Sequence, residues 1–186
     1  MRGKSQMFVI VFMLFTLPAI RATTLARLSL DQLASAADGV ARVRCAGVES
    51  RWENGAIWTI TTFDVIEPMK GNLASQVVVR LPGGKVGHLT AAVDGAPRFS
   101  SGEEAVIFLE RARTGGYSVA GWVEGTFRIT VDVRTQRETV TQDSSGFAVF
   151  DAATRTFRTE GIRRMHLELF RARVAAAIAR AQEKTR

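Results

Sequence analysis

Apolar side chains recur at every second position through the middle of this chain, in short runs that end at turn residues. The first run alternates apolar and basic side chains from Ala41 to Cys45, and an Asn54-Gly55 pair follows it. A period of two places successive side chains on opposite faces of a β-strand, and Asn-Gly accepts the positive φ angles of a tight hairpin. The pattern therefore predicts antiparallel strands that are joined by hairpins.

Further runs of the same kind extend the prediction to a whole sheet. Strands are expected at Ile57–Glu67, Val77–Leu81, His88–Val93, Ala105–Leu109, Tyr117–Trp122 and Phe127–Val131, with two weak strands or turns near residues 147–150 and 156–158. Ala105–Leu109 is apolar at every position, which is typical of a strand buried on both faces. Ile66 breaks the alternation of the longest strand and predicts a bend. Six or so short strands fit a barrel or a sandwich, and the bent strand favours a small OB-like barrel.

Two segments have the period of an α-helix instead. Ser29 and Gln32 have the spacing of a capping box, so a short helix is expected to begin there and to end near Gly39. A longer helix is predicted from about Arg163 to Gln182, and its apolar side chains form one stripe: Leu167, Phe170, Val174, Ala177, Ile178 and Ala181. The expected fold is mainly β, a small antiparallel OB-like barrel with a short N-terminal helix and a longer amphipathic C-terminal helix.

The N-terminus has the three parts of a secretory signal peptide in order. Arg2 and Lys4 are basic, residues 7–20 are apolar without charge, and Ala22 is a small residue suited to the cleavage site. The apolar stretch is shorter than the ~20 residues that span a bilayer, and it contains Pro18. We therefore expect residues 1–22 to be removed and the mature protein to be periplasmic or extracellular.

The basic excess of the chain is concentrated at one end. Residues 163–186 hold seven basic and two acidic side chains, whereas residues 23–162 hold 15 basic and 16 acidic ones. Nucleic acid is therefore a disfavoured partner, because phosphate binding needs clustered Lys and Arg. The helical stripe can pack on the barrel or lie weakly on an anionic membrane surface, and its four large apolar residues favour packing. The expected division is a signal peptide at 1–22, a barrel domain with its short helix at 23–162, and a C-terminal helix packed on the barrel at 163–186.

A family resemblance is carried by turn and loop residues across about half of the chain. They are Gly47–Trp52, Thr59–Thr61, Lys70-Gly71, Gly83-Gly84, Gly95–Phe99, Gly102–Glu104 and Gly125–Phe127. This set resembles a group of uncharacterised secreted bacterial proteins that are thought to share an OB-type barrel with netrin-like modules and the tissue inhibitors of metalloproteinases. Those inhibitors begin with a cysteine that chelates zinc, whereas the mature chain here is expected to begin at Thr23. The resemblance therefore implies a fold and no activity.

The chain contains no recognisable catalytic or metal-binding motif. His88 and His166 are the two histidines, and they lie far apart in sequence on segments of different kinds. Cys45 is the single cysteine and falls on the apolar face of its strand, where a thiol is usually inert. The sequence has no nucleophile elbow, no His-Glu-x-x-His and no phosphate loop. We expect no catalytic residues, no cofactor and no metal.

Two sets of residues are candidates for binding. Trp52, Trp58 and Trp122 can form a stacking platform for bases or sugars, or they can fill the barrel core, which is the favoured interpretation. The irregular stretch 82–102 is a candidate contact surface, with Arg98 and Phe99 as its anchors. The favoured function is a secreted, non-enzymatic interaction module for another extracytoplasmic protein. A binder of single-stranded nucleic acid or glycans and an enzyme with an unrecognised site remain as alternatives.

Overall fold

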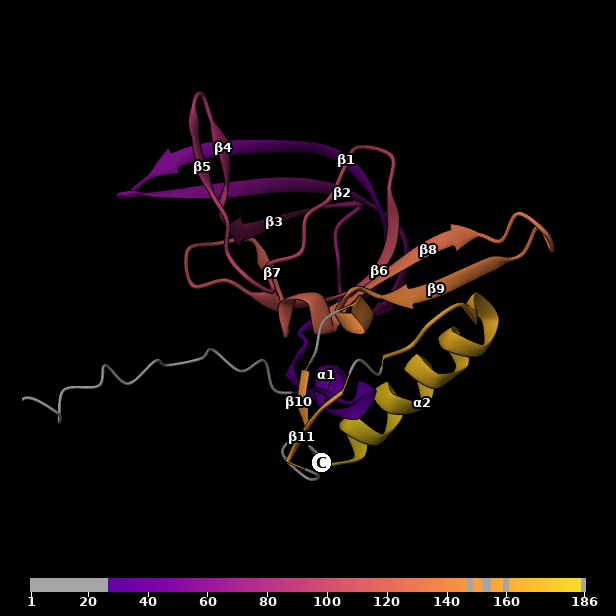
Figure 1. Cartoon of the computed structure of the whole chain (residues 1–186). Coiled ribbons are helices and arrows are strands. Elements are labelled where there is room, and N and C mark those ends of the chain that lie inside the picture. The colour runs from indigo at the N-terminus through magenta and orange to yellow at the C-terminus, as the bar shows by residue number, and fades with distance from the viewer. Residues whose placement is uncertain (1–26, 147–148, 152–154, 159–160, 185–186) are drawn as a thin grey trace, which may run out of the picture.

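The computed structural model describes residues 27–146, 149–151, 155–158 and 161–184 (Figure 1). The predicted signal peptide lies outside these residues. The helices are α1 (Leu30–Ala36) and α2 (Leu167–Lys184), with two short 3₁₀ helices, η2 (Trp122–Gly125) and η3 (Asp143–Gly146). The strands are β1 (Gly39–Glu53), β2 (Ala56–Lys70), β3 (Gln76–Pro82), β4 (Gly84–Val86), β5 (Leu89–Ala91), β6 (Glu104–Arg111), β7 (Tyr117–Val119), β8 (Thr126–Val131), β9 (Glu138–Gln142), β10 (Val149–Asp151), β11 (Thr156–Arg158) and β12 (Met165–His166).

Five of the strands form a closed ring. The main sheet has the order β1-β2-β3-β7-β6-β8-β9-β12, and an additional pairing of β1 with β6 closes its first five strands on themselves. The pairings are antiparallel except between β3 and β7, which are parallel. The pairs β4–β5 and β10–β11 form two small separate sheets. The prediction of a mainly β protein with one short helix and one longer C-terminal helix is confirmed.

The interior of the ring holds one of two apolar cores. Its buried members are Ala41, Val43, Cys45, Phe63, Val77, Val79, Leu81, Phe99, Ala105, Ile107, Leu109 and Val119. The predicted core position of Cys45 is therefore confirmed, and burial raises the pKa of its thiol. Strand β6 contributes Ile107 to this core and Phe108 to the other one. The prediction that this strand is buried on both faces is therefore confirmed.

The second core lies between the outer face of the sheet and the two helices. All six residues of the predicted α2 stripe are buried in it, together with Leu33 of α1. Phe127 lies at its centre, with its ring 5.6 Å from that of Phe108 and 4.7 Å from that of Phe170. The apolar stripe of α2 therefore faces the sheet and α1. The helix begins at Leu167 instead of Arg163, because the two residues before it pair with β9 as strand β12.

Helix α1 is fixed at both ends by residues that the structure places close to it. The capping box is present, since the Ser29 hydroxyl accepts from the Gln32 amide and the Gln32 side chain accepts from the Ser29 amide. At the other end the Lys70 ammonium donates to the carbonyl oxygens of Ala34 and Ala37, which a helix end leaves unpaired. Lys70 is the last residue of β2, so this contact joins α1 to the ring.

Two predicted strands have different bounds in the structure. The strand expected at 117–122 ends at Val119, because Gly121 and Trp122 both have positive φ angles, 63° and 52°, and turn the chain into η2. The strand expected at 88–93 is the second half of the β4–β5 hairpin, and His88 lies in its turn. Gly83 and Gly84, with φ angles of 91° and 132°, start this hairpin directly after β3.

Candidate functional site

Strands β1 and β2 continue beyond the last pairing of β1 with β6 as an arm, residues 46–60, and β3 borders the β2 side of this arm as far as Trp58. Strand β6 pairs with β1 only as far as Arg44, and a bulge between Cys45 and Gly47 separates the ring part of β1 from the arm. The arm ends in a tight turn in which Asn54 and Gly55 have φ angles of 51° and 80°, as the sequence predicts. In the part of the chain that the structure describes, β2 is the one strand that pairs with β1 along the arm.

The β4–β5 hairpin crosses one face of this arm, and we call it the crossing hairpin (Figure 1). The Ser50 and Thr59 hydroxyls lie 3.1 Å apart on that face, and Thr59 donates to the Gly83 carbonyl at 2.7 Å. The Lys85 amide donates to the Ser50 hydroxyl at 3.4 Å. Two hydrogen bonds therefore hold the start of the hairpin against the arm, and the contact between Ser50 and Thr59 links the two hydroxyls that make them.

Gly84 lies at the point of closest approach between the two hairpins. Its φ of 132° is unfavourable for any residue with a side chain, and a Cβ atom there would overlap the hydroxyl oxygens of Ser50 and Thr59. Gly87, in the turn of the same hairpin, also has a positive φ but open space around it. An alanine at Gly84 would therefore meet a collision and a more strained backbone, whereas one at Gly87 would meet only the milder strain of the left-handed region.

Gly84→Ala should lower the free energy of unfolding by about 3 kcal/mol, because the new methyl group adds a collision to the backbone strain. Gly87→Ala, with strain alone, should cost about 1–2 kcal/mol. Urea denaturation of both variants measures the difference. Equal losses would show that the crossing hairpin is not held against the arm.

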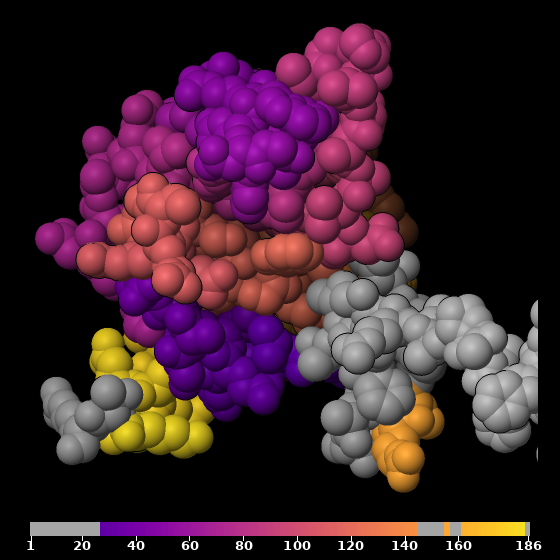
Figure 2. Space-filling model, turned by 90° about the vertical axis from the view of Figure 1, so that its left-hand side faces the viewer, coloured from indigo at the N-terminus to yellow at the C-terminus, as the bar shows by residue number. Residues whose placement is uncertain are grey.

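Three large apolar side chains are exposed where the arm and the crossing hairpin meet. Val48 and Trp52 are 42% and 56% exposed, and they lie on the same face of β1 as Ser50. Leu89 is 46% exposed and pairs with Val86 in the crossing hairpin. By strand alternation both residues lie on the same hairpin face as Gly84, and this face is directed at the arm because Gly84 approaches Ser50 and Thr59 there. Figure 2 shows the arm in purple at the top of the molecule, with the pink crossing hairpin beside it. We call these five residues, Val48, Ser50, Trp52, Val86 and Leu89, the arm site.

The structure does not bring the three tryptophans together. Trp52 pairs with Ile57 across the arm, so Trp58, the next residue, is directed to the opposite face. There the Arg80 guanidinium lies 4.4 Å from the centre of the Trp58 ring. Trp122 is in η2, which contacts β6, β7, β8 and β9. The alternative of a stacking platform is therefore absent from this arrangement. The favoured interpretation, that the three tryptophans fill the core, is wrong as well, because none of them is a buried member of either apolar core and Trp52 is 56% exposed.

The two predicted anchors of the 82–102 stretch have different surroundings. Phe99 is only 7% exposed and packs edge-to-face on Phe63 in the ring, with 4.8 Å between ring centres. Arg98 is exposed, and its carbonyl oxygen accepts a hydrogen bond from Arg128. Phe99 therefore fills the core of the ring, and the surface of this stretch that contributes to the arm site is the crossing hairpin.

Arg128 closes the end of the ring beside Phe99. Its guanidinium lies 4.6 Å from the Phe99 ring centre, binds Asp143 through two hydrogen bonds of 2.8 Å and also pairs with Glu103. Burial opposes the charge of Arg128, but these carboxylates outweigh it, and its pKa lies above the usual value. The ionisable groups that converge here neutralise one another, which is typical of a structural contact.

Glu124 is the most deeply buried carboxyl group of the described residues, at 2% exposure. The Gln142 side chain donates to its Oε2 at 3.0 Å and to its backbone carbonyl at 2.7 Å. Burial raises the pKa of Glu124 and favours its protonated form. The sequence gives no signal for this position, because a glutamate between two turn glycines is typical of an exposed loop.

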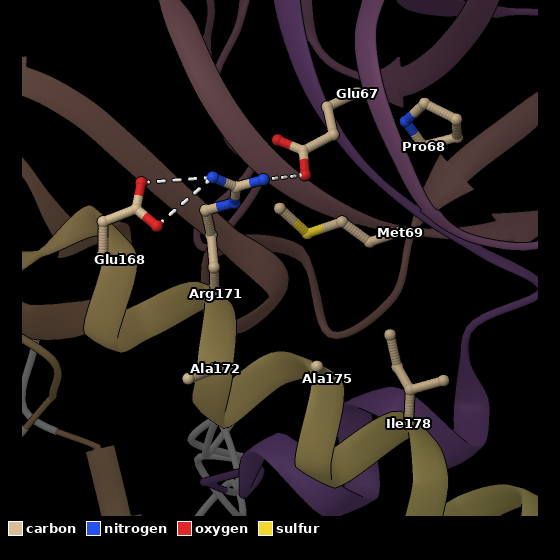
Figure 3. A pocket seen from close by; sticks show the side chains of 8 residues that line it. All are labelled: Glu67, Pro68, Met69, Glu168, Arg171, Ala172, Ala175 and Ile178. Atoms are coloured by element: carbon tan, nitrogen blue, oxygen red, sulfur yellow. Dashed lines mark hydrogen bonds and ion pairs between the residues drawn. The ribbon is translucent and has the colours of Figure 1, made fainter.

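A groove of about 450 Å³ lies between the end of β2 and helix α2 (Figure 3). Arg171 lies across it and pairs with Glu67 on β2 and with Glu168 on α2. Met69 and Ile178 are among its apolar lining residues. The charged side chains that line the groove already pair with one another, so the groove offers a ligand fewer available charges.

The described residues contain no group of three or more histidine, cysteine, aspartate or glutamate side chains that could hold a metal ion. Among the same residues, no helix has the length and apolar character needed to cross a bilayer. No protein-family model matches the chain, and no curated protein matches it either.

Proposed function

We propose that this chain is an exported, non-enzymatic binding module, built on an OB-like barrel, that docks another extracytoplasmic protein at the arm site. The observation that carries the proposal is the exposure of Val48, Trp52 and Leu89 around the crossing of the two hairpins. These three exposed apolar side chains lie around the crossing hairpin, beside a stretch of β1 whose other edge pairs with no strand of the described residues. Contiguous exposed apolar surface is typical of interaction sites.

The ring supports the barrel part of the proposal. An OB-type barrel is a five-stranded, partly open Greek-key barrel, and the ring has five strands in the order β1-β2-β3-β7-β6 with β6 returning to β1. In such barrels the loop between the first two strands takes part in ligand binding, and here that loop is the tip of the arm. The likeness is one of fold, so the partner is argued from the arm site itself.

The surfaces that the alternative functions need are less well supported. Stacking of bases or sugars requires neighbouring exposed aromatic rings, and Trp52 and Trp58 are directed to opposite faces of the arm. Acid–base catalysis requires ionisable groups that are available to a substrate, whereas Arg128 and its carboxylates bind one another. A protein partner remains the best match to an apolar surface with an exposed tryptophan.

Capture of partner proteins by the immobilised mature chain tests this function. The extracytoplasmic fraction of the cells that make the protein is passed over the mature chain, over its Trp52→Ser/Leu89→Ser variant, and over a Val131→Ser/Val133→Ser control. Val131 and Val133 are exposed like the arm-site residues but lie on the β8–β9 hairpin. We expect a partner recovered by the mature chain and the control but at least tenfold less by the arm variant. Equal recovery by all three proteins, or none above bare resin, would reject the proposal.

A further inference from the structure

The free edge of the arm presents unpaired backbone groups in a regular row. The two-residue turn makes Glu53 and Ala56 a hydrogen-bonded pair of the ladder, so Arg51 and Glu49 also bond to β2. By the alternation of an antiparallel ladder, Val48, Ser50 and Trp52 direct their N–H and C=O groups away from β2. No strand among the described residues pairs with them on that side. Such a row is a template for another extended chain.

We infer that this edge binds an extended peptide segment of the partner as an added β-strand, next to β1 and beneath the crossing hairpin. The inference rests on the proposed function and specifies how the arm site holds its partner. Figure 1 shows the crossing hairpin passing over both strands and continuing beyond β1. An added strand would therefore have Val48 and Trp52 beside it and Val86 and Leu89 above it. Strand addition supplies affinity through the main chain, and side-chain contacts supply specificity.

The side chains around the edge define the chemistry of the added strand. Residues on the face of Ser50 would meet the apolar members of the arm site, so they should be apolar and β-branched. Residues on the opposite face would lie beside Glu49 and Arg51, whose side chains pair with each other at 2.6 Å. An acidic residue opposite Arg51 and a basic residue opposite Glu49 complement these charges.

The edge of a second copy of this chain has complementary charges, but its crossing hairpin would collide with the first one. Antiparallel pairing of Val48–Trp52 with itself, centred on Ser50, would place Glu49 opposite Arg51 twice. The same register would place both crossing hairpins over Ser50, because Lys85 and Gly84 contact that residue in each copy. The occupant is therefore a segment of another protein that has no hairpin at this position.

A synthetic heptapeptide, Thr-Val-Glu-Val-Lys-Val-Thr with blocked ends, tests the inference on the ¹⁵N-labelled mature chain. Bound antiparallel, its valines face the backbone of Val48, Ser50 and Trp52, and its Glu lies opposite Arg51. At millimolar peptide we expect amide shifts at these three residues and at least fivefold slower hydrogen exchange there. The amides of Glu49 and Arg51, already bonded to β2, should exchange at an unchanged rate.

Two N-methylated peptides form a matched pair of controls. A methyl group on the central valine nitrogen blocks a bond to β1 and should weaken binding at least tenfold, whereas one on the Glu nitrogen points to solvent and should leave binding unchanged. On the protein side, Val48→Pro removes an edge donor that β2 does not use, and it should weaken binding of the unmodified peptide while the ring amides keep their shifts.

Three results would overturn strand addition. They are equal binding of both methylated peptides, shifts that map away from the arm, and arm amides already protected by self-association of the free protein. If the Trp52→Ser/Leu89→Ser variant still loses its partner in such a case, the proposed function stands and only the mode of binding fails. If that variant keeps its partner, the function itself fails.

Discussion

Replacing Phe170 by alanine should lower the free energy of unfolding by about 3–5 kcal/mol, because the change opens a cavity at the centre of the helix-covered core. Phe170 is fully buried, and its ring lies 4.7 Å from that of Phe127, which also contacts Phe108. The lost contacts therefore belong to α2, β8 and β6 together. Urea denaturation of the unsubstituted protein and of the Phe170→Ala variant measures the difference.

The residue before Phe170 provides the control. Leu169 is on the same turn of α2 but is 50% exposed, so Leu169→Ala removes side-chain atoms of which half already face water. Both positions have the same backbone environment, and alanine suits a helix at either one. We expect Leu169→Ala to cost less than about 1 kcal/mol. Similar losses at the two positions would mean that α2 is not packed on the sheet.

Arg128→Met should cost about 3 kcal/mol of stability, the second large effect that the structure predicts. Methionine keeps the apolar stem of Arg128 over Phe99 but removes the guanidinium. The Asp143 carboxylate, which is mostly buried, then loses two hydrogen bonds, and the Arg98 carbonyl loses its donor. A buried charge without its partner costs more than the pair contributes. Thermal and urea unfolding at neutral pH measure the loss.

Arg44→Met is the matched control for this charge removal. Arg44 pairs with Glu104, as Arg128 pairs with its carboxylates, but its side chain is more than half exposed. Glu104 also keeps a second cation, because Arg42 binds it at 2.6 Å. We expect the unfolding midpoint of Arg44→Met to stay close to that of the unsubstituted protein. If the midpoint of Arg128→Met also stays close to that of the unsubstituted protein, Arg128 does not stabilise the fold in the way described above.

The sequence is most informative where one local pattern determines the structure. The period of α2 identifies all six of its buried residues, and the continuous apolar run of β6 identifies a strand buried on both faces. The position of Cys45 in the core follows from the alternation of β1. Each of these patterns depends on residues close in sequence, and the tertiary structure does not override them.

The arm site depends on contacts that such patterns do not contain. Val48 alternates like a core residue, but it is exposed because β6 leaves β1 before reaching it. Leu89 falls in a predicted short strand with no predicted partner, and its position over the arm follows from the approach of Gly84 to Ser50 and Thr59. The separation of Trp52 from Trp58 does follow from local rules, since a two-residue turn after Glu53 places them on opposite faces. Phe99 is buried by ring closure, which depends on the pairing of β1 with β6.

Strand β6 makes the two cores of this protein thermodynamically inseparable. Its odd-numbered residues from Ala105 to Leu109 pack inside the ring, while Val106 and Phe108 pack beneath the helices. Neither core can melt alone without exposing one face of a strand that the other core still needs. Heat should therefore unfold both cores in one cooperative transition. Loss of α2 would therefore also destabilise the core inside the ring. A partner bound at the arm would stabilise the helices as well as the ring, because binding to the folded state shifts the whole unfolding equilibrium.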